Sequence, residues 1–227
     1  IKIFAEEILE FRKDVELTFQ ISIDDLPTNH NKVRKVKNLF NNCIETYQLL
    51  KKMPDNINPV VSITVTHENC DNIKSIFNYL HIDCGIESIK CTIVRDEGVY
   101  KTPHEKKKKI YDAYNWLTNE IKEKISVNQI KNYNASSIQG RVHRKKDILS
   151  WEMVKKMYMN PKYISPCHAG SLFGIITANG KIFPCEILED KLLGNLRDHE
   201  MNFMKIWNNN ETSNVKKFIK KTNCNCT

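Results

Sequence analysis

The chain has 227 residues, 41% of them hydrophobic and 27% charged, and its formal net charge is +8. This composition is that of a globular protein with room for one large domain or two small ones, and it excludes low-complexity and collagen-like sequences. No run of about 18 apolar residues and no signal peptide occurs, so we expect no membrane span, and the irregular cysteine spacing favours a reducing, cytoplasmic setting over disulfides.

The first 95 residues alternate between predicted strands and predicted helices. Apolar residues recur at helical spacing in some segments and form alternating or continuous runs in others. The predicted strands are residues 17–23, 60–65 and 86–94, and the predicted helices are residues 3–12, 31–52 and 73–80, the last capped by Asn69 or Asp71. This order is typical of βαβ units on a parallel sheet, as in half of a β/α barrel or in a doubly wound sheet.

The first predicted strand carries polar side chains on one face, namely Thr18, Gln20, Ser22 and Asp24. A strand buried in a parallel sheet is usually apolar on both faces. The polar face therefore indicates either the lumen of a barrel that holds a polar ligand or a solvent-facing antiparallel strand.

The middle of the chain predicts one long helix over residues 104–127 and a shorter one over residues 148–159. Residues 128–146 are polar and show little periodicity, so we expect a loop and a domain boundary there. Beyond Tyr163 we expect a hairpin around Asn179-Gly180, a helix capped by Asp198 and a last helix over residues 215–219.

The excess positive charge lies mainly in residues 106–109, 141–146 and 216–221. We interpret these runs as solvated faces, because nucleic-acid binding would favour basic residues interleaved with exposed aromatic ones or a known module. A basic nucleic-acid-binding protein stays a secondary alternative, and an acidic or phosphorylated substrate is compatible with the charge.

Four cysteines form two groups that flank the predicted hairpin: Cys167, Cys185, Cys224 and Cys226. Cys167 and Cys185 stand at neighbouring ends of the hairpin, and the last helix can return the other two to the same place. Such soft ligands indicate zinc or an iron–sulfur cluster. The spacing lacks the Cys-x2-Cys pairs typical of structural zinc, so it favours a cluster, while zinc and unmetallated thiols stay open. The other cysteines lie in apolar patterns and indicate packing.

These residues resemble those of a known family. The pattern Cys167-x12-Gly180-x4-Cys185, with a later cysteine group, resembles the SPASM and twitch modules of radical S-adenosylmethionine enzymes. The segment Ile21-Ser22-Ile23-Asp24-Asp25, followed by His30 and Arg34, is similar to a strand motif of that family, with Asp25 where glycine is usual. Further similar segments are Thr64-Val65-Thr66 with Asn69, Pro184-Cys185, Gly194-Asn195-Leu196 and Ile206-Trp207-Asn208.

The resemblance implies an α/β fold in three parts. Residues 1–130 would be the C-terminal half of a partial (β/α)6 TIM-like barrel, and residues 131–162 a linker and helix. Residues 163–227 would be a small α+β module with a β-hairpin, closer to the twitch form than to the longer SPASM form. The family's Cys-x3-Cys-x2-Cys loop, which holds the catalytic [4Fe–4S] cluster, is absent. We therefore expect a fragment, inactive alone, whose loop precedes Ile1.

The resemblance also implies the chemistry. Such enzymes cleave S-adenosylmethionine to a 5′-deoxyadenosyl radical that abstracts hydrogen from a substrate, here a peptide, a sugar or a cofactor precursor, with electrons from flavodoxin or ferredoxin. The predicted cofactor-binding residues are Ser22, Asp24, Arg34 and Arg95, and the predicted ligands of an auxiliary [4Fe–4S] cluster are Cys167, Cys185, Cys224 and Cys226. Asp96 or Glu97 is a candidate proton acceptor, and the sequence selects no catalytic residue. The alternative function is a zinc-stabilised, non-catalytic binding module.

Overall fold

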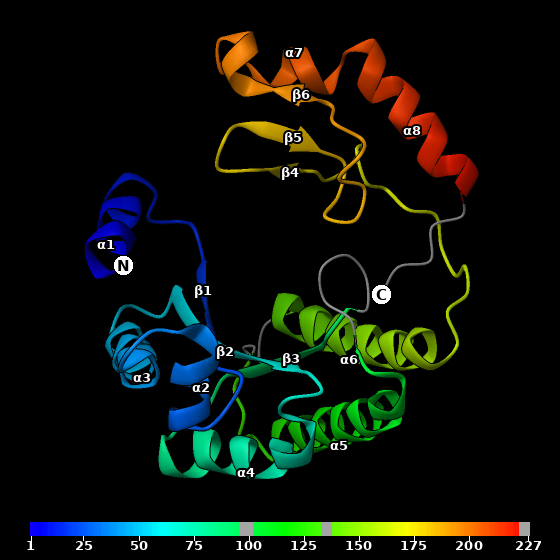
Figure 1. Cartoon of the computed structure of the whole chain (residues 1–227). Coiled ribbons are helices and arrows are strands. Elements are labelled where there is room, and N and C mark those ends of the chain that lie inside the picture. Colours follow the sequence, from blue (N-terminus) through cyan, green and yellow to red (C-terminus); the bar gives the residue numbers. More distant parts are fainter. Residues whose placement is uncertain (96–101, 133–137, 223–227) are drawn as a thin grey trace. The chain divides into compact units, whose positions relative to one another are not determined.

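The computed structural model describes residues 1–95, 102–132 and 138–222 (Figure 1). The described residues divide into two units: the first ends at Met159 and the second begins at Asn160. No helix in these described ranges is both long enough and apolar enough to cross a bilayer.

The described part of the first unit contains a parallel sheet of three strands in the order β1-β2-β3. The strands are β1 (Leu17–Ser22), β2 (Ile57–Val65) and β3 (Ile89–Ile93). Ser22 pairs in register with Ser62, and Thr64 pairs with Thr92, so all three strands point the same way. The predicted α/β class with a parallel sheet is confirmed.

The two faces of β1 differ, as the alternating sequence predicts. Ile21 is buried and Ile23, just beyond the strand, is fully buried, whereas Thr18, Gln20 and Ser22 are exposed. Helices α3 (Leu39–Lys51) and α5 (Lys107–Ser126) contact the sheet, and α4 (Ile73–Asn78) packs on α5 (Figure 1). The buried isoleucines, valines and aromatic side chains of these elements form the core.

One predicted helix is divided in two in the structure. The segment expected as a helix over residues 31–52 contains the end of α2 (Pro27–Arg34) and all of α3. Between the two helices, Lys35 and Asn38 have left-handed conformations with φ of 55° and 58°. The Asn31 side chain accepts the backbone N–H of Phe40 at 2.8 Å and so satisfies a donor at the start of α3. The apolar spacing continues across the break, so periodicity alone missed it.

The predicted loop over residues 128–146 is also wrong in its second half, because α6 (Ile138–Met159) begins within it. Its first turns are rich in arginine and lysine, which form helices well but give no apolar periodicity. Trp151 and Tyr158 are buried, and α6 packs on α5. Tertiary packing therefore extends a helix that the sequence predicts only from residue 148.

The first unit also has α1 (Lys2–Phe11), the 3₁₀ turns Cys70–Asn72 and His104–Lys106, and a π-helical turn, Tyr79–Asp83. Neither Asn69 nor Asp71 caps α4 with its side chain, because no side-chain bond forms at either helix start. Instead, the Asn69 side chain bonds to the ends of the strands.

The second unit contains short antiparallel strands: β4 (Ile175–Ile176), β5 (Lys181–Phe183) and β6 (Gly194–Asn195). A turn joins β4 to β5, and in it Gly180 has a φ of +83° and donates its N–H to the carbonyl of Thr177 at 2.8 Å. A 3₁₀ turn (Leu196–His199), α7 (Phe203–Trp207) and α8 (Asn210–Thr222) follow. Asn202, not Asp198, caps α7, since its side chain accepts the N–H of Lys205 at 3.2 Å.

Candidate functional site

The carboxyl ends of β1 and β2 are joined by the side chain of Asp24. One oxygen, Oδ1, accepts the backbone N–H of Thr64 at 2.9 Å, and Oδ2 accepts a charge-assisted hydrogen bond from the Arg34 guanidinium. The Asp24 side chain is 21% exposed and that of Arg34 is 45% exposed. Asp24 therefore connects β1, β2 and α2 at the edge of the sheet where α/β folds bind ligands.

A buried amide holds the same two strand ends together. The Nδ2 of Asn69 donates to the backbone carbonyls of Asp24 at 2.7 Å and of Thr64 at 2.8 Å, and its Oδ1 accepts the N–H of Thr66 at 2.8 Å. Asn69 is only 2% exposed. The amide thus satisfies three backbone groups at the partly buried ends of the two strands.

His30 is buried beneath this network, with 1% of its surface exposed. Its Nδ1 accepts the backbone N–H of Asp24 at 3.4 Å, and its ring meets that of Phe40 edge-on. Within the described residues its Nε2 has no hydrogen-bond partner. Burial lowers the pKa of His30 below the ordinary value, partly opposed by the charge of Asp24.

The other two predicted cofactor-binding residues lie at the same edge. Ser22 is the last residue of β1 and is exposed. Arg95 follows β3 by two residues and is exposed. The structure thus brings Asp24 and Arg34 into direct contact and places Ser22 and Arg95 at the ends of β1 and β3. Asp96 and Glu97 lie outside the described residues.

This edge is suited to an anionic group. A guanidinium carries five N–H donors and pairs readily with carboxylates, often through two parallel hydrogen bonds. Arg34 uses one terminal nitrogen on Asp24 and is nearly half exposed, so further donors can reach a ligand. The sequence analysis selected Asp24 and Arg34 as cofactor-binding residues. It named His30 and Asn69 as parts of similar segments, and Asn69 also as a candidate helix cap, but not their contacts with Asp24, because those contacts do not follow from local spacing.

The second candidate site lies in the C-terminal unit. Cys167 and Cys185 are half-buried free thiols, and both pack against one apolar cluster. That cluster consists of Ala169, Ile182, Leu193, Leu196, Ile206, Val215 and Ile219. The N–H of Ala169 points at the sulfur of Cys167 at 3.5 Å. A backbone N–H directed at a sulfur is a contact by which proteins tune iron–sulfur clusters, so this cysteine suits a cluster ligand.

The other two predicted ligands, Cys224 and Cys226, lie outside the described residues. Within residues 1–95, 102–132 and 138–222, no group of three or more histidine, cysteine, aspartate or glutamate side chains is placed to hold a metal ion. The structure therefore brings two of the four predicted cysteines onto one core and leaves the complete ligand set a prediction.

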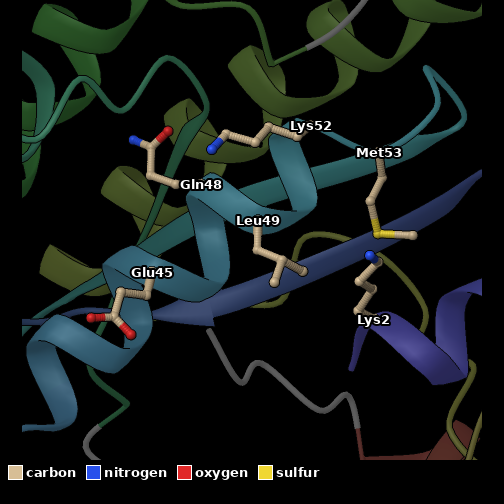
Figure 2. A pocket seen from close by; sticks show the side chains of 6 residues that line it. All are labelled: Lys2, Glu45, Gln48, Leu49, Lys52 and Met53. Carbon is tan, nitrogen blue, oxygen red and sulfur yellow. The ribbon is translucent and has the colours of Figure 1, made fainter.

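A surface groove of about 460 Å³ lies elsewhere in the first unit, between α1 and α3 (Figure 2). Its lining residues are Lys2, Glu45, Gln48, Leu49, Lys52 and Met53. None of them belongs to the network at the strand ends. Most are long, flexible side chains with mixed charge, and the groove adds no group to the candidate site.

Comparison with known proteins gives one family match and several similar folds. Residues 167–227 match the SPASM model, described as an iron-sulfur cluster-binding domain. A search of curated proteins finds no match. The matching segment begins at Cys167, includes Cys185 and extends to the last residue of the chain.

Several solved structures of one protein, anSMEcpe, have a similar fold. A histidine-tagged form of anSMEcpe with bound AdoMet is 14% identical over 98% of this chain, with a TM-score of 0.60. "Native anSMEcpe with bound AdoMet" is 15% identical over 96%, with a TM-score of 0.59. "Native anSMEcpe with bound AdoMet and Cp18Cys peptide" is 14% identical over 98%, with a TM-score of 0.56.

The chain spans 57% of the length of the first two structures and 58% of the third. At this identity the likeness shows the fold. The family match confirms the predicted resemblance to a SPASM-type iron–sulfur module over residues 167–227, and the AdoMet-bound structures share the fold over 96–98% of the chain.

Proposed function

We propose that this chain is part of a radical S-adenosylmethionine enzyme in which the first unit helps to bind the cofactor and the second unit holds an auxiliary [4Fe–4S] cluster. The observation that carries the proposal is the SPASM match, which begins at one half-buried cysteine and includes another on the same core. The S-adenosylmethionine bound in the structures of similar fold supports the cofactor.

In this proposal the polar edge of the sheet binds the cofactor. The exposed hydroxyl of Ser22 donates to the polar part of the ligand, and the Arg34 guanidinium, held by Asp24, pairs with its carboxylate. Arg95, beyond the end of β3, adds positive charge at the same edge. When bound and reduced, the cofactor and its catalytic cluster supply a 5′-deoxyadenosyl radical for hydrogen abstraction.

The auxiliary cluster would be held by Cys167, Cys185, Cys224 and Cys226. The apolar core behind Cys167 and Cys185 excludes water from one side of the site, and the Ala169 N–H stabilises negative charge on the Cys167 sulfur. Four thiolates without histidine or carboxylate ligands are the usual donor set for such a cluster.

A peptide is the substrate class that we favour. Two of the structures of similar fold contain a peptide, named "Kp18Cys peptide" and "Cp18Cys peptide" in their descriptions. A small electron-transfer protein such as flavodoxin or ferredoxin would supply the reducing electrons.

Iron counting tests the proposal. The full-length protein is reconstituted anaerobically with iron and sulfide, and wild type is compared with Cys185→Ala. We expect the variant to lose about four iron atoms per chain and the matching absorbance. The matched control is Cys43→Ala, which removes a half-buried thiol of α3 in the first unit and keeps the iron content.

Two outcomes would contradict the auxiliary cluster. Unchanged iron in Cys185→Ala would show that this thiol binds no cluster. Stoichiometric zinc without sulfide, lost in the same variant, would favour the zinc-stabilised binding module instead.

A further inference from the structure

The carboxylate of Asp24 is engaged within the protein on both of its oxygens. Oδ1 accepts the N–H of Thr64 at 2.9 Å, and Oδ2 pairs with the Arg34 guanidinium. Because both oxygens already accept hydrogen bonds within the protein, the carboxylate orients the guanidinium and does not bind an external ligand directly. Arg34, at 45% exposed, is the member of the pair that solvent or a ligand reaches more easily.

Asp24 is itself fixed by contacts with three residues, of which Asn69 and His30 are buried. Thr64 holds its side chain from β2. Asn69, at 2% exposed, holds its backbone carbonyl at 2.7 Å and ties it to that of Thr64. His30 of α2 accepts its backbone N–H. These contacts leave the Asp24 carboxylate little freedom to turn.

We propose that Asn69 and Asp24 are positioning residues for Arg34: Asn69 fixes Asp24, and Asp24 fixes the guanidinium that pairs with a ligand carboxylate. Asp24 then binds the cofactor only through Arg34. The identity of the carboxylate, the amino-acid part of S-adenosylmethionine, rests on the proposed function, whereas the Asn69–Asp24–Arg34 chain of contacts does not.

The physical benefit is preorganisation. A free arginine side chain samples many rotamers, and ordering it on binding lowers affinity. An arginine that a fixed carboxylate already holds has lost that rotamer freedom before the ligand arrives. Its planar guanidinium still has N–H donors that can pair with a second carboxylate.

The first test needs no ligand. Nitrogen-15 NMR of the 227-residue chain follows the Arg34 guanidinium in wild type, Asp24→Asn and Asn69→Ala. We expect slow rotation of the terminal nitrogens in wild type and fast rotation in both variants. Asp24→Asn keeps an oxygen for the Thr64 N–H and so should fold. The matched control, Asn72→Ala, changes an exposed asparagine three residues from Asn69 and should leave Arg34 unchanged. Unchanged Arg34 rotation in Asp24→Asn would overturn the proposal.

The second test is a double-mutant cycle on cofactor affinity. S-adenosylmethionine binding to the full-length, cluster-loaded protein is measured for Asp24→Asn, Arg34→Lys and the double variant. Each single change should weaken binding about tenfold, as for one hydrogen bond to a charged group. The double variant should bind no more weakly than Arg34→Lys alone, because Asp24 acts through Arg34.

Additive losses in this cycle would mean that Asp24 touches the ligand directly, and they would overturn the assignment. A wild-type protein that binds no S-adenosylmethionine would instead count against the proposed function. In that case the NMR comparison still decides whether Asn69 and Asp24 position Arg34.

Discussion

The two units of this chain hold their candidate sites in different ways. In the first unit the described strands have 6, 9 and 5 residues, and helices pack against the sheet. In the second unit the described strands have only 2, 3 and 2 residues. The first site is built by hydrogen bonds among strand ends, whereas the second consists of thiols on a small core.

The burial of apolar side chains shows the same contrast. Among the described residues, the first unit buries thirty apolar side chains, whereas the second buries one cluster of seven. A unit this small buries a smaller fraction of its surface on folding than a larger one, and such units often rely on a metal or a cross-link for stability. We therefore expect the first unit to be stable by packing and the second to gain much of its stability from the proposed cluster.

The strongest way to break this comparison is to remove the same kind of core side chain from each unit. Ile206 and Leu50 are each fully buried, the first in α7 and the second in α3. Replacing either with alanine should cost about 2–5 kcal/mol. In the cluster-free protein we expect Ile206→Ala to unfold the second unit, while Leu50→Ala leaves the first folded.

Hydrogen exchange resolves the two units in one experiment. The amide of Leu193, which bonds to Ile182 at 2.8 Å, reports on the second unit, and that of Ile23, which bonds to Ser62 at 3.0 Å, reports on the first. If Ile206→Ala kept the protection of Leu193 without the cluster, the second unit would be stable by packing alone.

A smaller effect is expected from adding one methyl group to a glycine in each unit. A Cβ at Gly174 would lie 2.9 Å from the Trp207 ring and 3.0 Å from the Phe183 carbonyl oxygen, whereas a Cβ at Gly85 meets nothing within 4 Å. Gly174→Ala should therefore cost about 1–3 kcal/mol by overpacking. Gly85→Ala should cost about 1–2 kcal/mol through its φ of +65° alone.

Combining each glycine variant with Trp207→Phe distinguishes a steric cause from a backbone cause. This substitution replaces the Trp207 ring, which faces Gly174, with a smaller ring. Chemical denaturation should show that Trp207→Phe relieves part of the Gly174→Ala cost and none of the Gly85→Ala cost. If the double variants of both glycines showed only additive losses, the Trp207 ring would be excluded as the cause of the Gly174→Ala cost.

The smallest predicted effect is a pH dependence in the first unit. Burial lowers the pKa of His30 in the folded state, with Asp24 and Asp25 acting to raise it and Arg34 to lower it. The unfolded chain takes up this proton near its ordinary pKa of about 6.5, so stability falls as the pH drops through that value. The loss ends once the pH is also below the lowered pKa of folded His30, so its total is set by the size of that shift.

Thermal unfolding between pH 7.5 and 5.5 measures this slope, where the range is set by the ordinary histidine pKa of about 6.5. His30→Gln should flatten it, and His104→Gln, a change at an exposed histidine, should not. A slope unchanged by His30→Gln would assign the acid sensitivity to other groups.

The secondary structure was predictable where the sequence is periodic and not where side chains act across elements. The three strands of the first unit follow from alternating or continuous apolar runs. The break between α2 and α3 depends on Asn31 bonding to Phe40, and α6 depends on packing against α5. Neither leaves a periodic signal, so the sequence predicted one helix where there are two and a loop where there is a helix.

For the candidate site at the strand ends, the sequence predicted some of the residues but not the contacts between them. Asp24 and Arg34 were predicted as neighbours of one ligand, yet the direct contact between them appears only in the folded structure. Asn69 was expected as a helix cap, but it bonds to strand ends far away in sequence, including Asp24. Sequence spacing can place residues at one edge of a sheet, but it cannot say which oxygen a given donor will reach.

The sequence by itself determined the parallel α/β class, the polar face of β1 and the cysteine pattern of the C-terminal module, because each of these follows from the spacing of residues that are close together in the chain. The tertiary structure alone decided that Asn69 ties β1 to β2, that Asp24 holds Arg34, and that Cys167 and Cys185 share a core. These contacts join residues far apart in the chain, and only the packing of strands and helices brings their atoms within bonding distance.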